Sequence, residues 1–501
     1  MPGHRPFSLR FPLGGLDRRY ALRDQAPFTT PDCMNVWPLD VTTGRERGGV
    51  RPGLTSLTTV AAPYGWTTGN YLDSGSKEAL FVTTSGGTYS TLNGSSWTLR
   101  VNTAVSTNLS SCAVYLGYVY QAQAGAKTRR KALPSGSESD LSNAGGGTAP
   151  ENCGIVVAHL DSLWLMADSA NPQVIYKCAT GDPTNWNTAI ATVSGAWTNT
   201  GSEGGQIGHA ITAGLSHDSR TLLVGSARAC YAIIGNPRNA GATQRISNRL
   251  GPLTHNAWCK GEGPDGGNNT YLMTVDGLCV IRQGSLTIET LSKNKIPDEL
   301  QGIDPADGDN VAIGFDGRWQ GIHIAVDPQS GSNVNFFYHI PTDSYWPTSY
   351  SQTLQLFPTF APAQTATTSS ILPMSSAGSV YQFDSESTED INSYIDLGPI
   401  RLAGPTGEGY IASIFGVLAD GSDDCNWKLR FGKSCEEAFL QTAAAHTFTG
   451  RKWSRESMNY SQNPRKGGYA AYLQIFDVEN ERWLIEEVCG EIGSRGMRRV
   501  G

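Results

Sequence analysis

The stretch YLMTVDGLCVI, residues 271–281, consists of two short apolar runs joined at Asp276-Gly277. An Asp-Gly pair between such runs predicts a β-hairpin, because glycine adopts the positive φ that a tight two-residue turn requires. LFVTTSGGTYSTL, residues 80–92, repeats the pattern around a pair of glycines. Both stretches therefore predict short antiparallel strands joined by tight turns.

Similar hairpins recur along the chain at a nearly constant spacing. Leu222, Leu272, Ile322 and Leu372 occupy similar places in four of them, fifty residues apart each time. Units of about 40–50 residues with up to four short strands are typical of β-propeller blades. Six or seven such units fit between residues 54 and 386, so we predict an all-β fold with a six- or seven-bladed β-propeller.

The composition agrees with many short strands. The chain of 501 residues has 58 glycines and only 17% charged residues, while 39% hydrophobic residues suffice for a large core. Its ten cysteines form no CxxC pair and no zinc-like cluster, which favours reduced, buried thiols. The formal net charge of −7 argues against a protein that grips nucleic acid, although DNA can still pass by without being held.

Three segments lie outside the repeat. Residues 1–53 predict an N-terminal arm that leads into the first strand, and residues 387–501 have the strand pattern of a C-terminal β-sandwich. Residues 123–152 predict an exposed, Gly/Ser-rich insertion in one blade. Its basic run is either a solvated loop or a contact to an acidic partner or to DNA phosphates, through Lys127, Arg129, Arg130 and Lys131.

A second group of basic residues precedes the first blade, in NVWPLDVTTGRERGGVRPGL, residues 35–54. Its glycines are not spaced as in a phosphate-binding loop that opens a helix, and Arg-Pro-Gly is typical of a turn. Two interpretations of Arg45, Arg47 and Arg51 stay open. They are solvated, or they pair bidentately with carboxylates of a neighbouring protomer.

No motif in the sequence assigns a catalytic residue, a metal site or a cofactor, and the eight histidines are dispersed. We therefore expect a protein without enzymatic activity. Trp186 and Trp346 follow turn-like segments and are either core residues or platforms for sugar stacking. The sequence has no apolar run of signal-peptide or membrane-span length.

Asn35, Pro38 and the turn Arg51-Pro52-Gly53, followed by the first propeller strand, resemble the start of structural proteins from tailed bacteriophages. GRWQGIHIAVD and FFYHIPTDSYWP, within residues 317–347, and GSVYQFD, residues 378–384, resemble late blades of the same proteins. The chain is thus similar to the β-propeller tail nozzle and head-completion family, which includes packaged-DNA stabilisation proteins and proteins like tail tubular protein B.

This resemblance implies a virion structural protein, either a tail nozzle or a head-to-tail adaptor. It implies a homo-oligomeric ring, most often a hexamer, that contacts portal, adaptor and other tail proteins while double-stranded DNA passes through. The protein would be assembled in the cytoplasm of the host bacterium and reside in the virion tail. A receptor- or carbohydrate-binding tail propeller, with or without glycan cleavage, is the alternative, and a cellular scaffold propeller is a third hypothesis.

Overall fold

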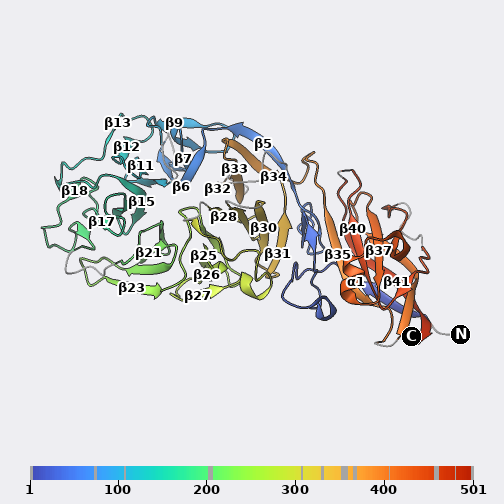
Figure 1. The fold of residues 1–501 in the computed structure, drawn as a ribbon. Coiled ribbons are helices and arrows are strands. Elements are labelled where there is room, and N and C mark those ends of the chain that lie inside the picture. The colour runs from blue at the N-terminus through green and yellow to red at the C-terminus, as the bar shows by residue number, and fades with distance from the viewer. Residues whose placement is uncertain are drawn as a thin grey trace.

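The computed structural model describes residues 4–72, 76–105, 109–200, 207–305, 309–328, 332–350, 359–364, 369–404, 407–455, 462–479 and 481–497. Almost all regular structure is β. Figure 1 shows a ring of small sheets at one end of an elongated molecule and a second β unit at the other, where both chain termini lie. The predicted all-β propeller with a C-terminal β-sandwich is confirmed.

The ring consists of seven four-stranded antiparallel sheets, which settles the number of blades at seven. Within each of the first six blades, the strands are joined in a meander that starts at the hub. In blade order the strands are β6 Pro63–Leu72, β7 Ser76–Thr84, β8 Gly87–Thr91, β9 Thr98–Val101; β10 Ser110–Tyr115, β11 Tyr118–Gln123, β12 Arg129–Ala132, β13 Glu138–Asp140; β15 Cys153–His159, β16 Ser162–Asp168, β17 Ile175–Lys177, β19 Trp197–Thr198; β20 Ala213–Ser216, β21 Thr221–Ser226, β22 Ala229–Ile234, β23 Ala242–Ser247; β24 Trp258–Glu262, β25 Asn268–Thr274, β26 Gly277–Ile281, β27 Ile288–Thr290; β28 Asn310–Asp316, β29 Gly321–Asp327, β30 Val334–His339, β31 Ser344–Thr348; and β32 Thr359–Gln364, β33 Ser369–Met374, β34 Ser379–Asp384, β5 Gly53–Thr59.

The seventh blade closes the ring, because its outermost strand comes from the other end of the propeller sequence. Strand β5 precedes blade 1 in the chain but pairs antiparallel with β34, from Gly53 opposite Asp384 to Thr59 opposite Ser379. This closure joins the first and last propeller segments through backbone hydrogen bonds within one blade.

The second unit is built from both ends of the chain. Strand β1 pairs with β41 at the edge of one sheet, and β2 pairs with β35 at the edge of the other. The segment predicted as an N-terminal arm thus contributes strands to the sandwich. Its two sheets are β1 Arg5–Leu9, β41 Ile485–Met497, β36 Gly407–Leu418, β39 Gly467–Gly468, and β2 Cys33–Met34, β35 Tyr394–Arg401, β40 Ala470–Phe476, β37 Asn426–Gly432, β38 Thr447–Thr449.

The remaining elements are short. Helix α1 follows a capping residue, since Ser434 Oγ accepts a hydrogen bond from the Glu437 N–H at 3.0 Å. This helix is α1 Cys435–Leu440. The other short elements are the 3₁₀ turns η1 Leu22–Asp24, η2 Ser292–Asn294 and η5 Ala444–His446, and the strand pairs β3 Val36–Trp37 with β4 Gly49–Val50 and β14 Gly146–Gly147 with β18 Asn185–Trp186.

The turns of the predicted hairpins are shifted by one residue. In the 271–281 hairpin, Thr274 pairs with Gly277, so Val275 and Asp276 form the turn and Gly277 begins the next strand. Gly277 has φ +90°, and a Cβ there would lie 2.2 Å from Ser292 Oγ. Glycine is therefore required at this position by both conformation and space.

Residues 123–152 differ from the predicted insertion. They contain β12 and β13, the two outer strands of blade 2, which pair from Arg129 opposite Asp140 to Lys131 opposite Glu138. The sequence pattern hid these strands because both are short and lie at the blade edge, where polar side chains are tolerated.

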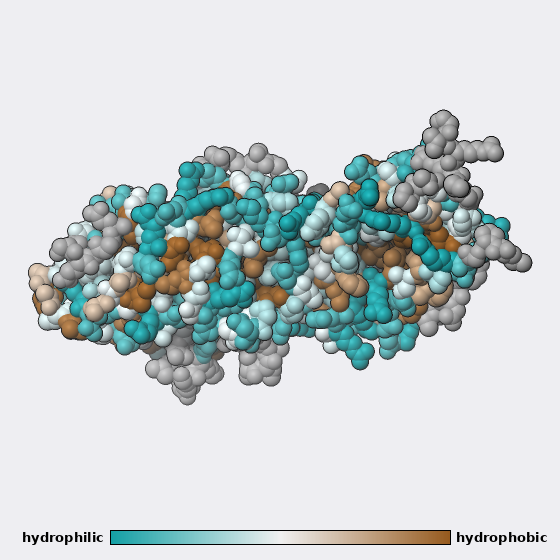
Figure 2. Space-filling model, turned by 90° about the horizontal axis from the view of Figure 1, so that it is seen from below, coloured by the Kyte–Doolittle hydropathy of each residue, from teal (hydrophilic) through white to brown (hydrophobic). Residues whose placement is uncertain are grey.

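The propeller and the sandwich share one hydrophobic core, and the segment between β2 and β5 bridges them. Trp37 is fully buried and stacks on Phe337 of blade 6, with ring centroids 3.9 Å apart. Phe11 stacks in the same way on Trp346, at 5.5 Å. Seen from below, the surface is largely hydrophilic, and apolar side chains gather in one region of each unit (Figure 2).

The ten cysteines are free thiols, of which nine are buried and Cys489 is half-buried. Among the described residues, no helix has the length and apolar character needed to cross a membrane.

Replacing Trp37 by alanine tests whether the two units depend on one core. The cavity left in the shared core beside blade 6 should lower the free energy of unfolding by about 3–5 kcal/mol. Scanning calorimetry should show both units destabilised together. Tyr20→Ala, at a side chain 45% exposed, is the control and should have little effect. A shift confined to one of two separate transitions would contradict the shared core.

Candidate functional site

Arg51, the last of the three arginines before blade 1, lies at the junction between the propeller and the sandwich. Its side chain is 1% exposed. It forms a bidentate ion pair with Glu389, from Nη1 to Oε2 at 3.1 Å and from Nη2 to Oε1 at 3.0 Å. Its Nη2 also donates to the Ser349 carbonyl at 2.8 Å, and the guanidinium lies 4.9 Å from the centre of the Tyr350 ring.

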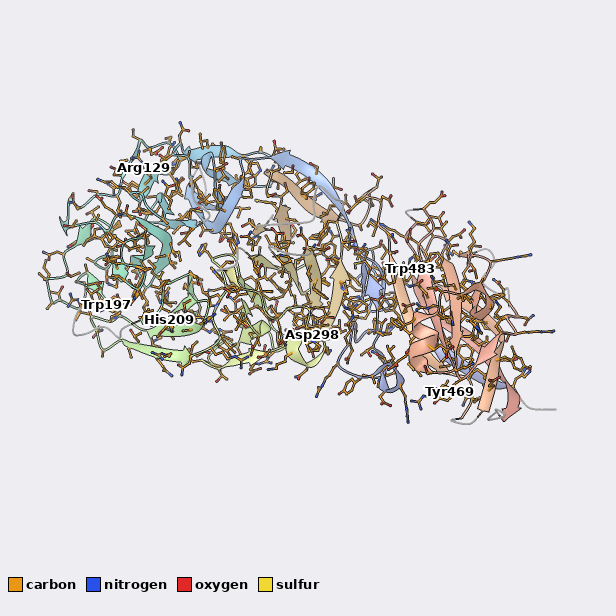
Figure 3. The ribbon with its side chains drawn as sticks, viewed as in Figure 1. Arg129, Trp197, His209, Asp298, Tyr469 and Trp483 are labelled. Carbon is orange, nitrogen blue, oxygen red and sulfur yellow. The ribbon has the colours of Figure 1, made fainter. Side chains whose placement is uncertain are left out.

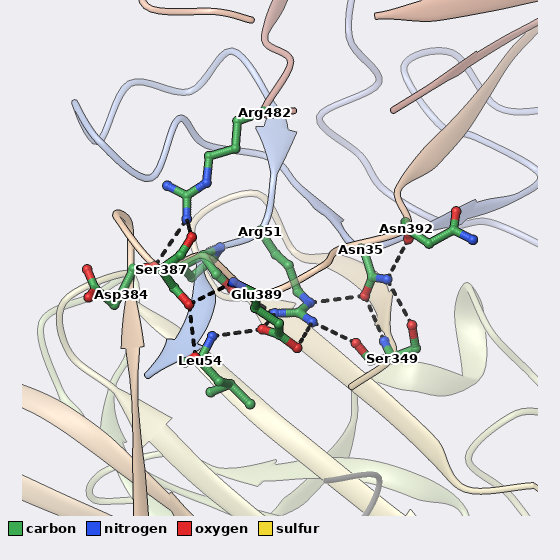
Figure 4. A network of polar contacts seen from close by, with 10 residues as sticks. Asn35, Arg51, Leu54, Ser349, Asp384, Ser387, Glu389, Asn392 and Arg482 are labelled. Carbon is green, nitrogen blue, oxygen red and sulfur yellow. Dashed lines mark hydrogen bonds and ion pairs between the residues drawn. The ribbon is translucent and has the colours of Figure 1, made fainter. Parts of the chain in front are cut away.

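Asn35 completes this network (Figure 4). Its Oδ1 accepts hydrogen bonds from Arg51 Nε at 3.1 Å and from the Ser349 N–H at 2.7 Å. Its Nδ2 donates to Ser349 Oγ at 2.8 Å and to the Asn392 carbonyl at 2.7 Å. Asn35 adopts φ 57°, a left-handed conformation that asparagine tolerates better than most residues. Three chain segments are thereby held together.

Glu389 also contacts the closing strand. Its Oε2 accepts a hydrogen bond from the Leu54 N–H at 2.8 Å, at the start of β5. Arg51 and Glu389 therefore join the residue before the closing strand to the segment that leaves blade 7 for the sandwich. This pair is internal to one chain and is unavailable to a neighbouring protomer.

The other two arginines of the stretch differ in exposure. Arg47 pairs with Asp40 at 2.6 Å and with Glu486 of the sandwich at 3.5 Å. Burial opposes ionisation of Asp40, but hydrogen bonds, those from Thr43 first, outweigh it and lower the pKa of that carboxyl. Arg45 is exposed and is the member of this group that a partner can reach.

The basic residues of blade 2 do not form an uncompensated patch. Lys127 pairs with Glu151 at 3.0 Å and is exposed. Arg129, labelled in Figure 3, pairs with Glu138 at 3.1 Å and with Asp140. The guanidinium of Arg130 lies 5.2 Å from the centre of the Tyr118 ring, and Lys131 is half-buried on β12. Strand pairing thus brings acidic partners to the run.

The structure does not bring the two basic groups together. Strand β12 lies on the side of the propeller away from the sandwich, whereas Arg51 precedes β5 at the junction (Figure 1). Trp186 and Trp346, the two tryptophans considered as sugar platforms, are 5% and 0% exposed. They are core residues and cannot stack on a bound sugar.

Sequence reasoning missed a cavity at the hub of the propeller. It has a volume of about 590 Å³ and is lined by residues from all seven blades. Each inner strand contributes only a few of them, so no local motif could have revealed the cavity. Aromatic residues are prominent in the wall, which includes Trp66, Trp258, Phe315 and Phe360.

Blades 1 and 5 meet across the hub. The rings of Trp66 and Trp258 have centroids 6.4 Å apart, and Asn256 Nδ2 donates to the Tyr64 carbonyl at 2.6 Å. The indole N–H of Trp258 and the Nδ1 of His255 are buried without a hydrogen-bond partner in the described part of the chain. The cavity therefore has polar atoms as well as an apolar wall.

Two histidines lie near the cavity at the ends of inner strands. His159 Nδ1 and Ser216 Oγ share a hydrogen bond of 2.9 Å, and His217 Nδ1 and Thr270 Oγ1 share one of 2.7 Å. Burial lowers the pKa of both imidazoles, that of His159 to about 4. Within the residues that the structure describes, no three His, Cys, Asp or Glu side chains are grouped so as to hold a metal ion.

Known proteins with a similar fold differ widely from this chain. No family model matches the sequence, and no curated protein does. The extracellular domain of a putative one component system from B. thetaiotaomicron is 13% identical with a TM-score of 0.44, over 73% of this chain and 43% of that domain. Virginiamycin B lyase from Staphylococcus aureus is 12% identical with a TM-score of 0.40, over 66% of this chain and 97% of the lyase. The present chain thus spans less than half of the length of that extracellular domain.

Removing one partner of the buried pair should be costly. Glu389→Gln leaves the Arg51 guanidinium buried without a counter-charge, so the free energy of unfolding should fall by about 3–5 kcal/mol. Urea titration measures this change. Glu386→Gln, at an exposed carboxylate three residues away, is the matched control and should change stability by less than about 0.5 kcal/mol. If the two substitutions lowered the free energy of unfolding equally, the ion pair would not contribute to stability.

Stability should fall with acidification. Burial lowers the pKa of His159, His255 and His339 to about 4, while an unfolded histidine titrates near about 6.5. Between these values the unfolded chain binds protons that the folded chain does not. Each histidine therefore costs up to about 3 kcal/mol as the pH falls through this window.

Urea titrations at about pH 7.5 and pH 5 measure this loss. His339→Gln should make it smaller, whereas His4→Gln, at a side chain 46% exposed, should leave it unchanged. A free energy of unfolding that is the same at both pH values would refute the assignment of neutral imidazoles.

Proposed function

We propose that the chain is a structural subunit of a tailed-bacteriophage virion, a tail nozzle or a head-to-tail adaptor, which assembles into a ring that conducts and retains DNA. The observation that carries this proposal is the buried Arg51–Glu389 pair. Arg51 lies in the stretch that resembles the phage family, and the pair ties the propeller closure to the segment that leads into the sandwich. A mechanical part of a virion needs such a fixed relation between its units.

The negative net charge of the chain supports the proposal that the ring conducts DNA. Six copies at −7 each carry a formal net charge of −42. Where part of that charge faces the lumen, DNA phosphates are repelled from the wall, so the genome does not stall by binding. The basic residues of blade 2 fit the same role, since Lys127 and Arg129 are paired with carboxylates of the same chain.

The number of copies of this chain in each particle tests whether it forms a ring. In particles that contain this chain, averaged electron microscopy images should show a closed ring on the axis that joins capsid and tail, most simply with six copies. The purified chain should be monomeric by mass measurement and form rings only on its partner. One or three copies per particle, or a position on a peripheral fibre, would contradict the proposal.

Charge reversal at exposed basic residues tests whether they contact partner proteins in the particle. Arg45→Glu and Lys127→Glu reverse charges that the fold does not bury, so each should slow incorporation into particles and change its salt dependence while stability is unaffected. Arg228→Glu, at a side chain 75% exposed on blade 4, is the matched control. Incorporation of both variants at the rate of the control would remove these residues from the interface.

A further inference from the structure

The hub cavity contains one lysine whose charge has no direct partner. Lys260 lies on β24, where Thr270 of β25 is its strand neighbour, and it lines the cavity. Within the part of the chain that the structure describes, its ammonium group makes no ion pair or hydrogen bond. A half-buried cation without a counter-ion is unfavourable, because neither water nor a carboxylate fully compensates its lost hydration.

The nearby acidic groups do not act as a counter-ion for the Lys260 ammonium. Asp218 attracts Lys260 electrostatically, but its Oδ1 accepts hydrogen bonds from the N–H groups of Arg220 and Thr221, both at 2.7 Å. Glu78 and Glu262 also line the cavity and are exposed, but in the described part of the chain neither forms an ion pair with Lys260. Burial lowers the pKa of Lys260, against the attraction of Asp218.

The rest of the cavity wall is suited to contact the apolar part of a bound small molecule. Trp66 and Trp258 face each other across the hub, and Leu215 and Phe360 are 2% and 1% exposed. A volume of about 590 Å³ lies within the range of cavities that hold small organic ligands.

We propose that the hub cavity binds a small amphipathic molecule with a single negative charge and an aromatic or aliphatic body. The anionic group pairs with the ammonium of Lys260, and the apolar body lies against Trp66 and Trp258. A second negative charge would meet Glu78 or Glu262 at the cavity, which restricts the ligand to a monoanion. This site is independent of ring formation and of the proposed role in the virion.

Two fluorescent probes that differ mainly in charge test the site. Anilinonaphthalene sulfonate carries an aromatic body and one negative charge, and N-phenylnaphthylamine carries a similar body without the charge. The wild-type chain should bind both. Lys260→Met should weaken binding of the sulfonate by about tenfold or more, because a charge-assisted contact is lost, and should leave binding of the uncharged probe nearly unchanged.

Two further variants keep the experiment decisive. Lys260→Arg retains the positive charge and should retain most of the sulfonate affinity. Lys293→Met removes an exposed lysine of η2 that does not line the cavity, and it should bind both probes like the wild type. The proposal is overturned if the wild type binds neither probe. It is equally overturned if Lys260→Met and Lys293→Met affect sulfonate binding alike.

Discussion

A buried guanidinium must be fully paired, and this requirement at Arg51 organises the whole molecule. Its partners are Glu389, Asn35 and the Ser349 carbonyl, which belong to three segments far apart in the sequence. Each is placed by a different unit: the N-terminal segment, the end of blade 6 and the exit from blade 7. The network around the ion pair is therefore complete only when the N-terminal segment, the end of blade 6 and the exit from blade 7 are all in place. Such a pair contributes more to the specificity of the arrangement than to net stability.

The same junction explains how a closed propeller can carry a second unit rigidly. The closing strand β5 pairs with β34, and the residues on either side of this pair continue into the shared core around Trp37. A linker outside the core would allow the units to swing. Here the aromatic stack of Trp37 on Phe337 and the ion pair act on the same short segment, so motion between the units would have to break both.

The local signals in the sequence were sufficient for the fold class and for most of the blades. Glycine-containing hairpins at a regular spacing predicted the propeller, although the turn at Gly277 is displaced by one residue. The number of blades could not be fixed, because the last blade takes β5 from before the first. The basic run of residues 127–131 was interpreted as part of a loop, since the acidic partners that β13 supplies become visible only through strand pairing. The hub cavity was not foreseen, because Lys260 and Trp66 come from different blades and meet only in the closed ring.

Because β1 pairs with β41, the order in which the strands are synthesised limits when the protein can fold. Strand β1 is synthesised long before its partner β41, and β5 must wait in the same way for β34. The propeller cannot close until β34, which ends at Asp384, has been translated, and the sandwich cannot be completed until β41, Ile485–Met497, has followed. The nascent chain therefore holds unpaired strand edges for much of its synthesis, and contacts of such large sequence separation form slowly. Chaperones that shield exposed strand edges would then set the yield of native protein in the cell that makes it.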